Sequence, residues 1–156
     1  MKKFFLLFAL TLLVALPLSV RAQGDAKQPT QNIVDVELEK DSLHNLEVAR
    51  HYFKLRKAYV AVLQRCEEII AGNPAFSRLD EVLFYAGASS LNLSQGKGKQ
   101  NPGLYVIHEG EKKRTLNAEE FRDLARDYFS QLVKTYPNST FRSQAETELS
   151  ALGGLK

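Results

Sequence analysis

The chain has 156 residues, a formal net charge of +3 at pH 7 and one cysteine. A single cysteine excludes an internal disulfide, so stability has to come from packing of apolar side chains. Without residues 1–22, which carry Lys2, Lys3 and Arg21 and no acidic residue, 18 basic residues face 18 acidic ones. This neutral balance argues against nucleic acid or anionic lipid as a partner, and we expect any membrane association to be peripheral.

Residues 1–22 have the pattern of a secretory signal peptide. Two lysines precede an apolar run over 4–20, and Val20-Arg21-Ala22 is a candidate cleavage site. The run contains Pro17 and is slightly shorter than the roughly 20 residues that span a bilayer, which favours cleavage over membrane anchoring. We therefore expect a mature chain that begins at Gln23 and is exported to the periplasm, where it lies at most peripherally on the outer membrane.

The rest of the chain predicts a flexible leader followed by five helices. Residues 23–41 are mostly polar and lack sustained helical periodicity, so we expect them to be a leader, with Asp41 or Ser42 as the N-cap of the first helix. Apolar residues then recur every three or four positions. The helices are expected, in chain order, at about 42–53, 58–71, 77–93, from about 118, and 140–152.

These helices form a repeated pair. The second and fourth helices share an apolar pattern at an offset of 63 residues, and each is followed by a proline, Pro74 or Pro137. The first and third helices match at an offset of 37. A period in the thirties is typical of an α-solenoid, whose units bury their apolar faces by stacking on neighbours. Gly87, inside the third helix, is expected to allow close approach of another helix.

The two offsets differ by 26 residues, which places an insertion at about 96–117. Glycines and lysines at 96–99 favour a mobile loop, whereas the β-prone run Leu104-Tyr105-Val106-Ile107 favours a small hairpin. The segment is also locally basic, which suits either a solvated loop or a binding element. The sequence therefore leaves two choices open for this segment: a mobile loop or a hairpin, and a solvated loop or a binding element.

The paired pattern resembles tetratricopeptide repeats. The resemblance covers about 42–152 and is carried by the second helix of each pair, at Val62, Cys66, Ile69 and Pro74, and at Ala125, Phe129, Leu132 and Pro137. Within that superfamily, the endings AGNPAF and KTYPNS look like those of the outer-membrane assembly lipoprotein BamD and related periplasmic proteins. The resemblance implies an all-α, short tetratricopeptide-like solenoid of about five helices with an inserted loop or hairpin of 20–26 residues.

Candidate catalytic and metal-binding residues are few. His44, Glu47 and His51 share one face of the first helix at metal-ligand spacing, but no further cluster completes a site, so a solvated surface is favoured. Cys66 occupies an apolar position of the repeat and is expected in the core. Gly96-Lys97-Gly98-Lys99 lacks the strand, helix and Ser/Thr of a phosphate loop. We expect neither enzymatic activity nor a metal or cofactor.

The resemblance also implies where a partner binds. In tetratricopeptide proteins the first helix of each pair lines a concave groove, and outward positions here would be His44, Glu47, His51, Lys54, Glu81, Phe84 and Leu91. An envelope scaffold or adaptor that binds a protein or peptide, with a role in outer-membrane protein assembly, is the implied function. The alternatives are an accessory subunit that positions a substrate for an envelope enzyme, and a structural module that self-associates.

Overall fold

The computed structural model describes residues 36–154 and shows the all-α, helical-repeat-like fold predicted from the sequence. The proposed signal peptide and the first part of the leader lie outside these residues. In chain order the elements are α1 (Val36–His51), the π-helical turn η1 (Tyr52–Arg56), α2 (Tyr59–Gly72), α3 (Leu79–Ser94), the 3₁₀ turn η2 (Pro102–Leu104), β1 (Val106–Glu109), β2 (Lys112–Thr115), α4 (Ala118–Thr135) and α5 (Arg142–Ala151).

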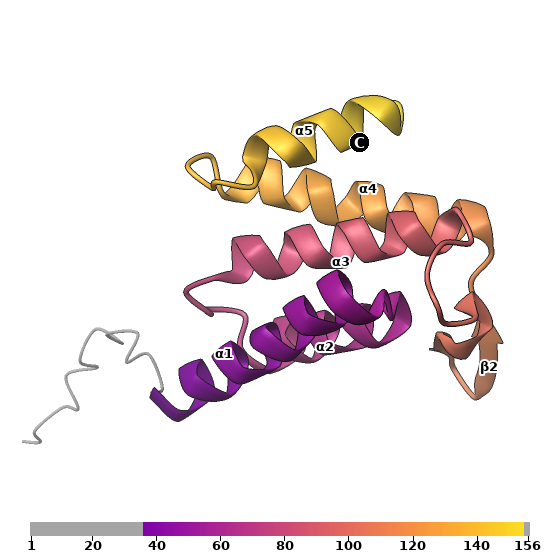
Figure 1. The fold of residues 1–156 in the computed structure, drawn as a ribbon, viewed down its shortest axis with the longest axis horizontal. Coiled ribbons are helices and arrows are strands. Elements are labelled where there is room, and N and C mark those ends of the chain that lie inside the picture. Colours follow the sequence, from indigo (N-terminus) through magenta and orange to yellow (C-terminus); the bar gives the residue numbers. More distant parts are fainter. Residues whose placement is uncertain (1–35, 155–156) are drawn as a thin grey trace, which may run out of the picture. The chain divides into compact units, whose positions relative to one another are not determined.

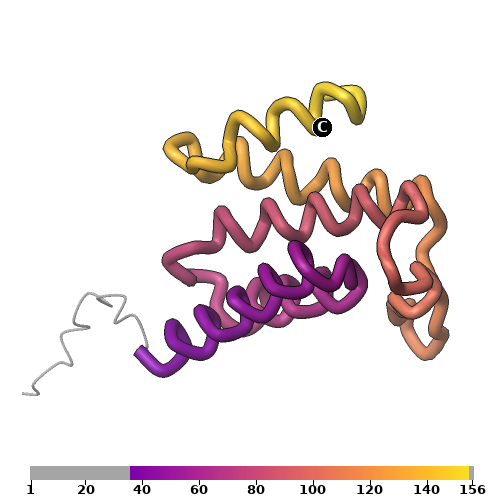
Figure 2. The backbone as a smooth tube through the Cα atoms, viewed as in Figure 1, coloured from indigo at the N-terminus to yellow at the C-terminus, as the bar shows by residue number. Residues whose placement is uncertain are grey.

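Each helix packs on the next one in the chain (Figure 1). The backbone trace places α3 between the pair formed by α1 and α2 and the pair formed by α4 and α5 (Figure 2). The arrangement buries an apolar core whose largest fully buried side chains include Phe121, Phe129 and Leu63. Because α3 has helices on both sides, it forms the middle of the fold. A surface groove between the two helix pairs would therefore have α3 at its base.

Gly87 permits the close contact between α3 and α4. A Cβ atom built at this position would lie 2.7 Å from the Phe129 ring, which is closer than real Cβ contacts. Phe129 itself is fully buried. The expectation that this glycine allows close helix approach is confirmed.

The first helix begins at Val36, so placing its N-cap at Asp41 or Ser42 was wrong. Ser42 is buried, its hydroxyl donates to the Leu38 carbonyl at 2.7 Å, and it accepts a hydrogen bond from the Asn73 side chain at 3.1 Å. A serine that is satisfied within the helix and by a neighbouring segment can occupy a helix interior. Residues 36–41, predicted as part of the leader, are therefore helical.

The first helix does not end directly at its last α-helical residue, His51. It continues as the π-helical turn η1, and the chain then reverses at Lys57, which has a left-handed φ of 50°. The amide of Ala58 donates to the Tyr52 carbonyl at 3.2 Å and closes this turn. Lys54 to Lys57 are consequently presented to solvent at one end of α1.

The insertion contains the small hairpin that was one of its two predicted forms. β1 and β2 pair antiparallel, from Val106 opposite Thr115 to Glu109 opposite Lys112, and Gly110 in the turn has a φ of +62°. Tyr105, just before β1, is buried and anchors the hairpin to the helices.

α4 begins with a capping box in which Asn117 accepts from the Glu120 amide at 3.0 Å and Glu120 accepts from the Asn117 amide at 2.8 Å. These paired bonds satisfy two backbone donors that would lack a partner at the start of a helix.

Across residues 36–154, none of the helices combines the length and apolar character needed to cross a membrane.

Candidate functional site: a groove over α3

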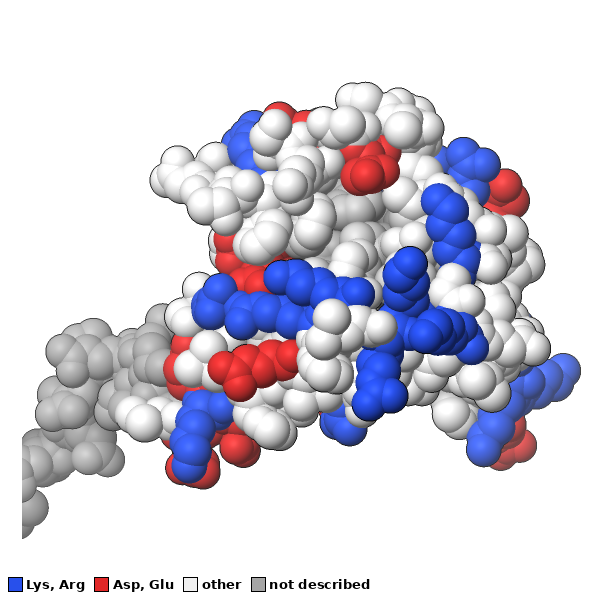
Figure 3. Space-filling model, viewed as in Figure 1, with Lys and Arg blue, Asp and Glu red and all other residues white. Residues whose placement is uncertain are grey.

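A groove lies over α3, between η1 on one side and α5 on the other. It has a volume of about 300 Å³. In the space-filling view a hollow with a largely uncharged floor lies below α5 (Figure 3). The groove is lined by Phe53, Phe84, Ala88, Leu91, Asn92, Gln95, Lys97 and Glu148.

The floor comes from one face of α3. Phe84, Ala88 and Leu91 are separated by four and three residues, a spacing that aligns side chains along a helix. All three are half-buried, so apolar surface remains open to a ligand. A second hollow of about 280 Å³ shares Leu91, Gln95 and Glu148 with the groove and extends it toward the start of α4.

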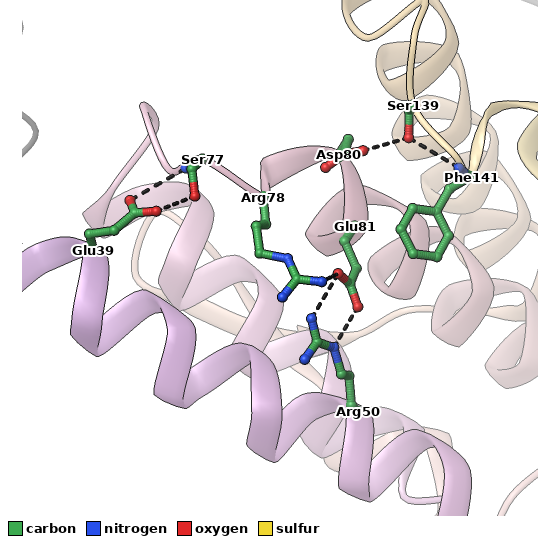
Figure 4. Close-up of polar contacts among 8 residues, drawn as sticks. All are labelled: Glu39, Arg50, Ser77, Arg78, Asp80, Glu81, Ser139 and Phe141. Carbon is green, nitrogen blue, oxygen red and sulfur yellow. Dashed lines mark hydrogen bonds and ion pairs between the residues drawn. The ribbon is translucent and has the colours of Figure 1, made fainter.

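α1, which continues into the η1 wall of the groove, is fixed to the α3 floor by an ion-pair network (Figure 4). Arg50 on α1 donates to both carboxylate oxygens of Glu81 on α3, at 2.5 and 2.8 Å, and Arg78 donates to the same carboxylate at 2.6 Å. The hydrogen bond to Glu81 raises the pKa of Arg50. Farther along, Ser77 donates to the Glu39 carboxylate of α1. These contacts hold α1 against α3 along its length.

The wall formed by α5 is fixed through the turn that precedes it (Figure 4). Ser139 donates to the Asp80 carboxylate of α3 at 2.5 Å and accepts from the Phe141 amide at 3.1 Å. The Phe141 ring stacks on Phe84 with centroids 4.9 Å apart and planes inclined by 27°. Phe141 therefore covers one end of the apolar floor, whereas Leu91 remains at the open end.

A cluster of cations stands beside the open end of the groove. Two segments supply it, the end of η1 and the loop after α3, and the Lys99 amide donates to the Lys57 carbonyl at 3.0 Å to join them. The five exposed members, called the basic rim below, are Lys54, Arg56, Lys57, Lys97 and Lys99. None of the five forms an ion pair with the carboxylates of residues 36–154.

Of the residues predicted to bind a partner, the structure brings Phe84 and Leu91 into the groove and places Lys54 beside it. Glu81 was expected to point outward, and that expectation was wrong. Its carboxylate is 5% exposed because two arginines cover it. The Glu81 carboxylate stays beneath these two arginines because a buried charge is stable only next to groups of opposite charge.

The other three predicted partner-binding residues lie on the exposed side of α1. His44, Glu47 and His51 are solvent-exposed, and none of them lines the groove. Glu47 is close enough to Arg50 to raise the pKa of that guanidinium, as the weakest of several contributions.

Sequence reasoning missed Gln95, Lys97 and Glu148 as groove residues. Lys97 was assigned to the insertion, and no binding role was predicted for Gln95 or Glu148. The signal that could have found Lys97 is its setting between Gly96 and Gly98, whose φ values of +63° and +102° form a tight turn directly after α3. Such a turn keeps a side chain near the end of the preceding helix.

Residues with catalytic potential are used structurally. Cys66 is fully buried, and burial raises the pKa of its thiol, so it is a poor nucleophile. Glu67 accepts hydrogen bonds from Tyr105 at 2.5 Å and Tyr128 at 3.1 Å. Burial raises the pKa of Glu67, and the two hydroxyl groups oppose that rise. This contact ties the hairpin and α4 to α2.

The basic residues of the insertion that lie outside the basic rim divide into two groups. Arg114 pairs with Glu109 at 2.6 Å and with Glu120 at 2.7 Å, so it stabilises the hairpin and its junction with α4. Lys112 and Lys113 are exposed on β2, outside the groove. Across the part of the chain that the structure describes, there is no group of three or more His, Cys, Asp or Glu placed to hold a metal ion.

Comparisons with known proteins add no relative: no protein-family model matches the chain, and neither a curated protein nor a solved structure matches it.

Proposed function

We propose that this chain is a non-enzymatic, protein-binding adaptor that is exported to the bacterial cell envelope. The observation that carries the proposal is the groove over α3, with an apolar floor between two walls that are fixed by hydrogen bonds and ion pairs. A rigid apolar groove suits an extended segment or a helix of a partner protein, because the binding energy is not spent on ordering the site.

The shape and lining of the groove favour a peptide segment over a small metabolite. Small-molecule sites enclose most of their ligand and converge several polar groups on it. This groove is open, and its floor is formed by side chains in a row along one helix. The half-buried Leu91, shared by both hollows, is the best candidate for the centre of the contact.

Export and envelope location rest on the N-terminal sequence pattern, and the tetratricopeptide resemblance favours an adaptor related to outer-membrane protein assembly. The described helices are compatible with a helical repeat, which commonly presents such binding surfaces. N-terminal sequencing of the protein from an envelope fraction tests export: we expect Gln23 as the first residue. Recovery of an intact residue 1–22 segment in a membrane pellet would contradict it.

Site-specific photo-crosslinking in intact envelopes tests the groove. The crosslinking amino acid is placed at Gln95, which is exposed on the groove margin, and separately at His44 on the exposed side of α1. We expect a discrete protein adduct from position 95 and none from position 44. Adducts from position 44 alone would move the binding site to the exposed side of α1, and an adduct with a second copy of the chain would favour self-association.

A further inference from the structure

The basic rim and the apolar floor together indicate the chemistry of the occupant. We propose that the groove binds an acidic segment of a partner protein, with apolar side chains on Ala88 and Leu91 and carboxylates over the basic rim. The inference rests on the proposed function, and it adds a charge and an orientation that the groove alone does not specify.

The first argument is that the rim is uncompensated within the described fold. Elsewhere in residues 36–154 arginines are commonly paired, for example Arg65 with Glu68 and Arg142 with Glu146. The five members of the rim have no such partner. Without residues 1–22 the chain has equal numbers of basic and acidic residues, so this cluster reflects placement and not an overall excess of positive charge.

The second argument is that the fold holds the two parts of the rim together. The Ala61 amide donates to the Gln100 side chain at 3.1 Å, and the Lys99 amide donates to the Lys57 carbonyl at 3.0 Å. Gly98 lies so close to this turn that a Cβ atom would be 2.7 Å from the Lys57 carbonyl oxygen. These contacts keep the two backbone segments side by side, so the exposed cations that they carry lie at one end of the groove, where an anion would reduce their mutual repulsion.

The third argument is position. Lys97 lines the groove itself, and Lys54 follows Phe53, which also lines it. Lys and Arg side chains gather along the margin of the hollow that faces α1 and η1 (Figure 3). On the opposite wall the charge is negative, because Glu148 of α5 lines both hollows.

The two walls therefore orient the occupant. Its acidic side chains face η1 and the loop after α3, and its neutral or basic side chains face Glu148. Charge complementarity of this kind sets register and association rate more than it sets affinity, so the apolar floor still supplies most of the binding energy. A basic segment would meet the rim with like charge.

The test selects 12-residue peptides from a random displayed library on the protein purified from the envelope fraction. We expect the selected peptides to combine apolar residues with a net negative charge. Fluorescence anisotropy then measures the best peptide on the wild type and on a variant with Lys54→Glu and Lys97→Glu. We expect binding to weaken at least about tenfold in the variant, because two attractive contacts become repulsive.

The matched control is Lys112→Glu with Lys113→Glu, which makes the same charge change on β2 outside the groove. Its affinity should stay within about twofold of the wild type, and the circular dichroism of both variants should match the wild type. Binding of the wild type should weaken as salt is raised from 50 to 500 mM, because exposed charge pairs are screened.

The other outcomes overturn the inference in distinguishable ways. Two outcomes would reject an acidic occupant but still support a groove that binds peptides. In one, the selected peptides are neutral or basic, and in the other, the best peptide has the same affinity for both double variants. If no peptide is selected, the wild-type protein is sedimented with phosphatidylglycerol vesicles, and so is the Lys54/Lys97 variant. Sedimentation of the wild type that is lost in the variant would reject the proposed function as well and would make the basic rim a lipid-binding surface. The exposed Leu55 beside the rim makes the vesicle experiment a necessary arm.

Discussion

Arg50 on α1 donates two hydrogen bonds to the carboxylate of Glu81 on α3, at 2.5 and 2.8 Å. Two parallel bonds between a guanidinium and a carboxylate fix both distance and orientation. Arg78, the residue that precedes α3, donates a third hydrogen bond to the same carboxylate. The network thus sets the position of α1, and of the η1 wall that follows it, relative to the apolar floor of the groove.

Glu81→Gln should destabilise the fold. The change removes a buried charge that compensates two guanidinium groups, of which Arg50 is half-buried, and breaking a buried pair on one side costs about 3 kcal/mol. The control is Glu68→Gln, where an exposed pair with Arg65 is lost and the cost should stay below about 1 kcal/mol. Urea unfolding followed by circular dichroism measures both. Equal midpoints would show that the Arg50–Glu81 pair does not hold α1 in place.

Gly87→Ala should also destabilise the fold, for a steric reason. The added methyl group would meet the Phe129 ring at 2.7 Å, and this ring is fully buried, so α3 and α4 have to move apart. Overpacking of this kind costs about 1–3 kcal/mol. Gly72→Ala is the matched control, because nothing lies within 4 Å of a Cβ atom there. A Gly87 variant as stable as the Gly72 variant would mean that the two helices tolerate a wider separation.

The helices could be predicted because their apolar periodicity is strong. The ends predicted for the second helix agree with α2 to within one residue, and the close approach at Gly87 followed from an isolated glycine in a helix. The start of α1 could not be predicted. Ser42 has the residue type of an N-cap, but its hydroxyl bonds to the Leu38 carbonyl within the helix and accepts from Asn73, which lies 31 positions away.

The groove could be predicted only in part. Helical spacing identified Phe84 and Leu91, because both lie on one face of α3. The same spacing placed Glu81 on that face, but one of the two arginines that cover it, Arg50, comes from another helix. The joining of the two segments of the basic rim depends on a backbone contact between residues 57 and 99, which no local pattern encodes. Long-range contacts decide these positions, so a single sequence could not supply them.

Tyr105→Phe should loosen the hairpin while leaving the helices folded. The change removes the hydroxyl that donates to Glu67 at 2.5 Å, and a hydrogen bond to a charged group contributes about 1.5–3 kcal/mol. Tyr105 also packs against Phe121 at a centroid distance of 5.6 Å, and the phenylalanine keeps that contact. We expect trypsin to cut at Lys112 or Lys113 faster than in the wild type, with unchanged helical circular dichroism.

The outcome of that proteolysis distinguishes two roles of the insertion. Faster cutting with intact helices would mean that Tyr105 anchors an otherwise independent hairpin. Loss of helical signal would show that the hairpin contributes to the core, and deletion of residues 97–113 should then also unfold the chain. An unchanged cutting rate would show that the apolar contact with Phe121 is sufficient to hold the segment.

Glu67 should make the fold less stable as the pH rises. Burial raises the pKa of this carboxyl above its ordinary value of 4.5, while hydrogen bonds from Tyr105 and Tyr128 limit the rise. The folded state therefore binds the proton more tightly than the unfolded chain does. In that situation the contribution of this group to stability is greatest below pH 4.5 and is lost as the pH rises through the folded-state pKa.

Glu67→Gln removes the titrating proton but keeps a carbonyl that can accept from both tyrosines. The free energy of unfolding of the variant, relative to the wild type, should therefore increase from pH 4 toward neutral pH. Denaturant midpoints at several pH values measure this difference, and Glu68→Gln, on the adjacent exposed residue, is the control for a carboxyl at the surface. A difference that decreases as the pH rises would mean that the hydrogen bonds from Tyr105 and Tyr128 outweigh burial, and that the Glu67 carboxylate stabilises the junction of α2, α4 and the hairpin through its charge.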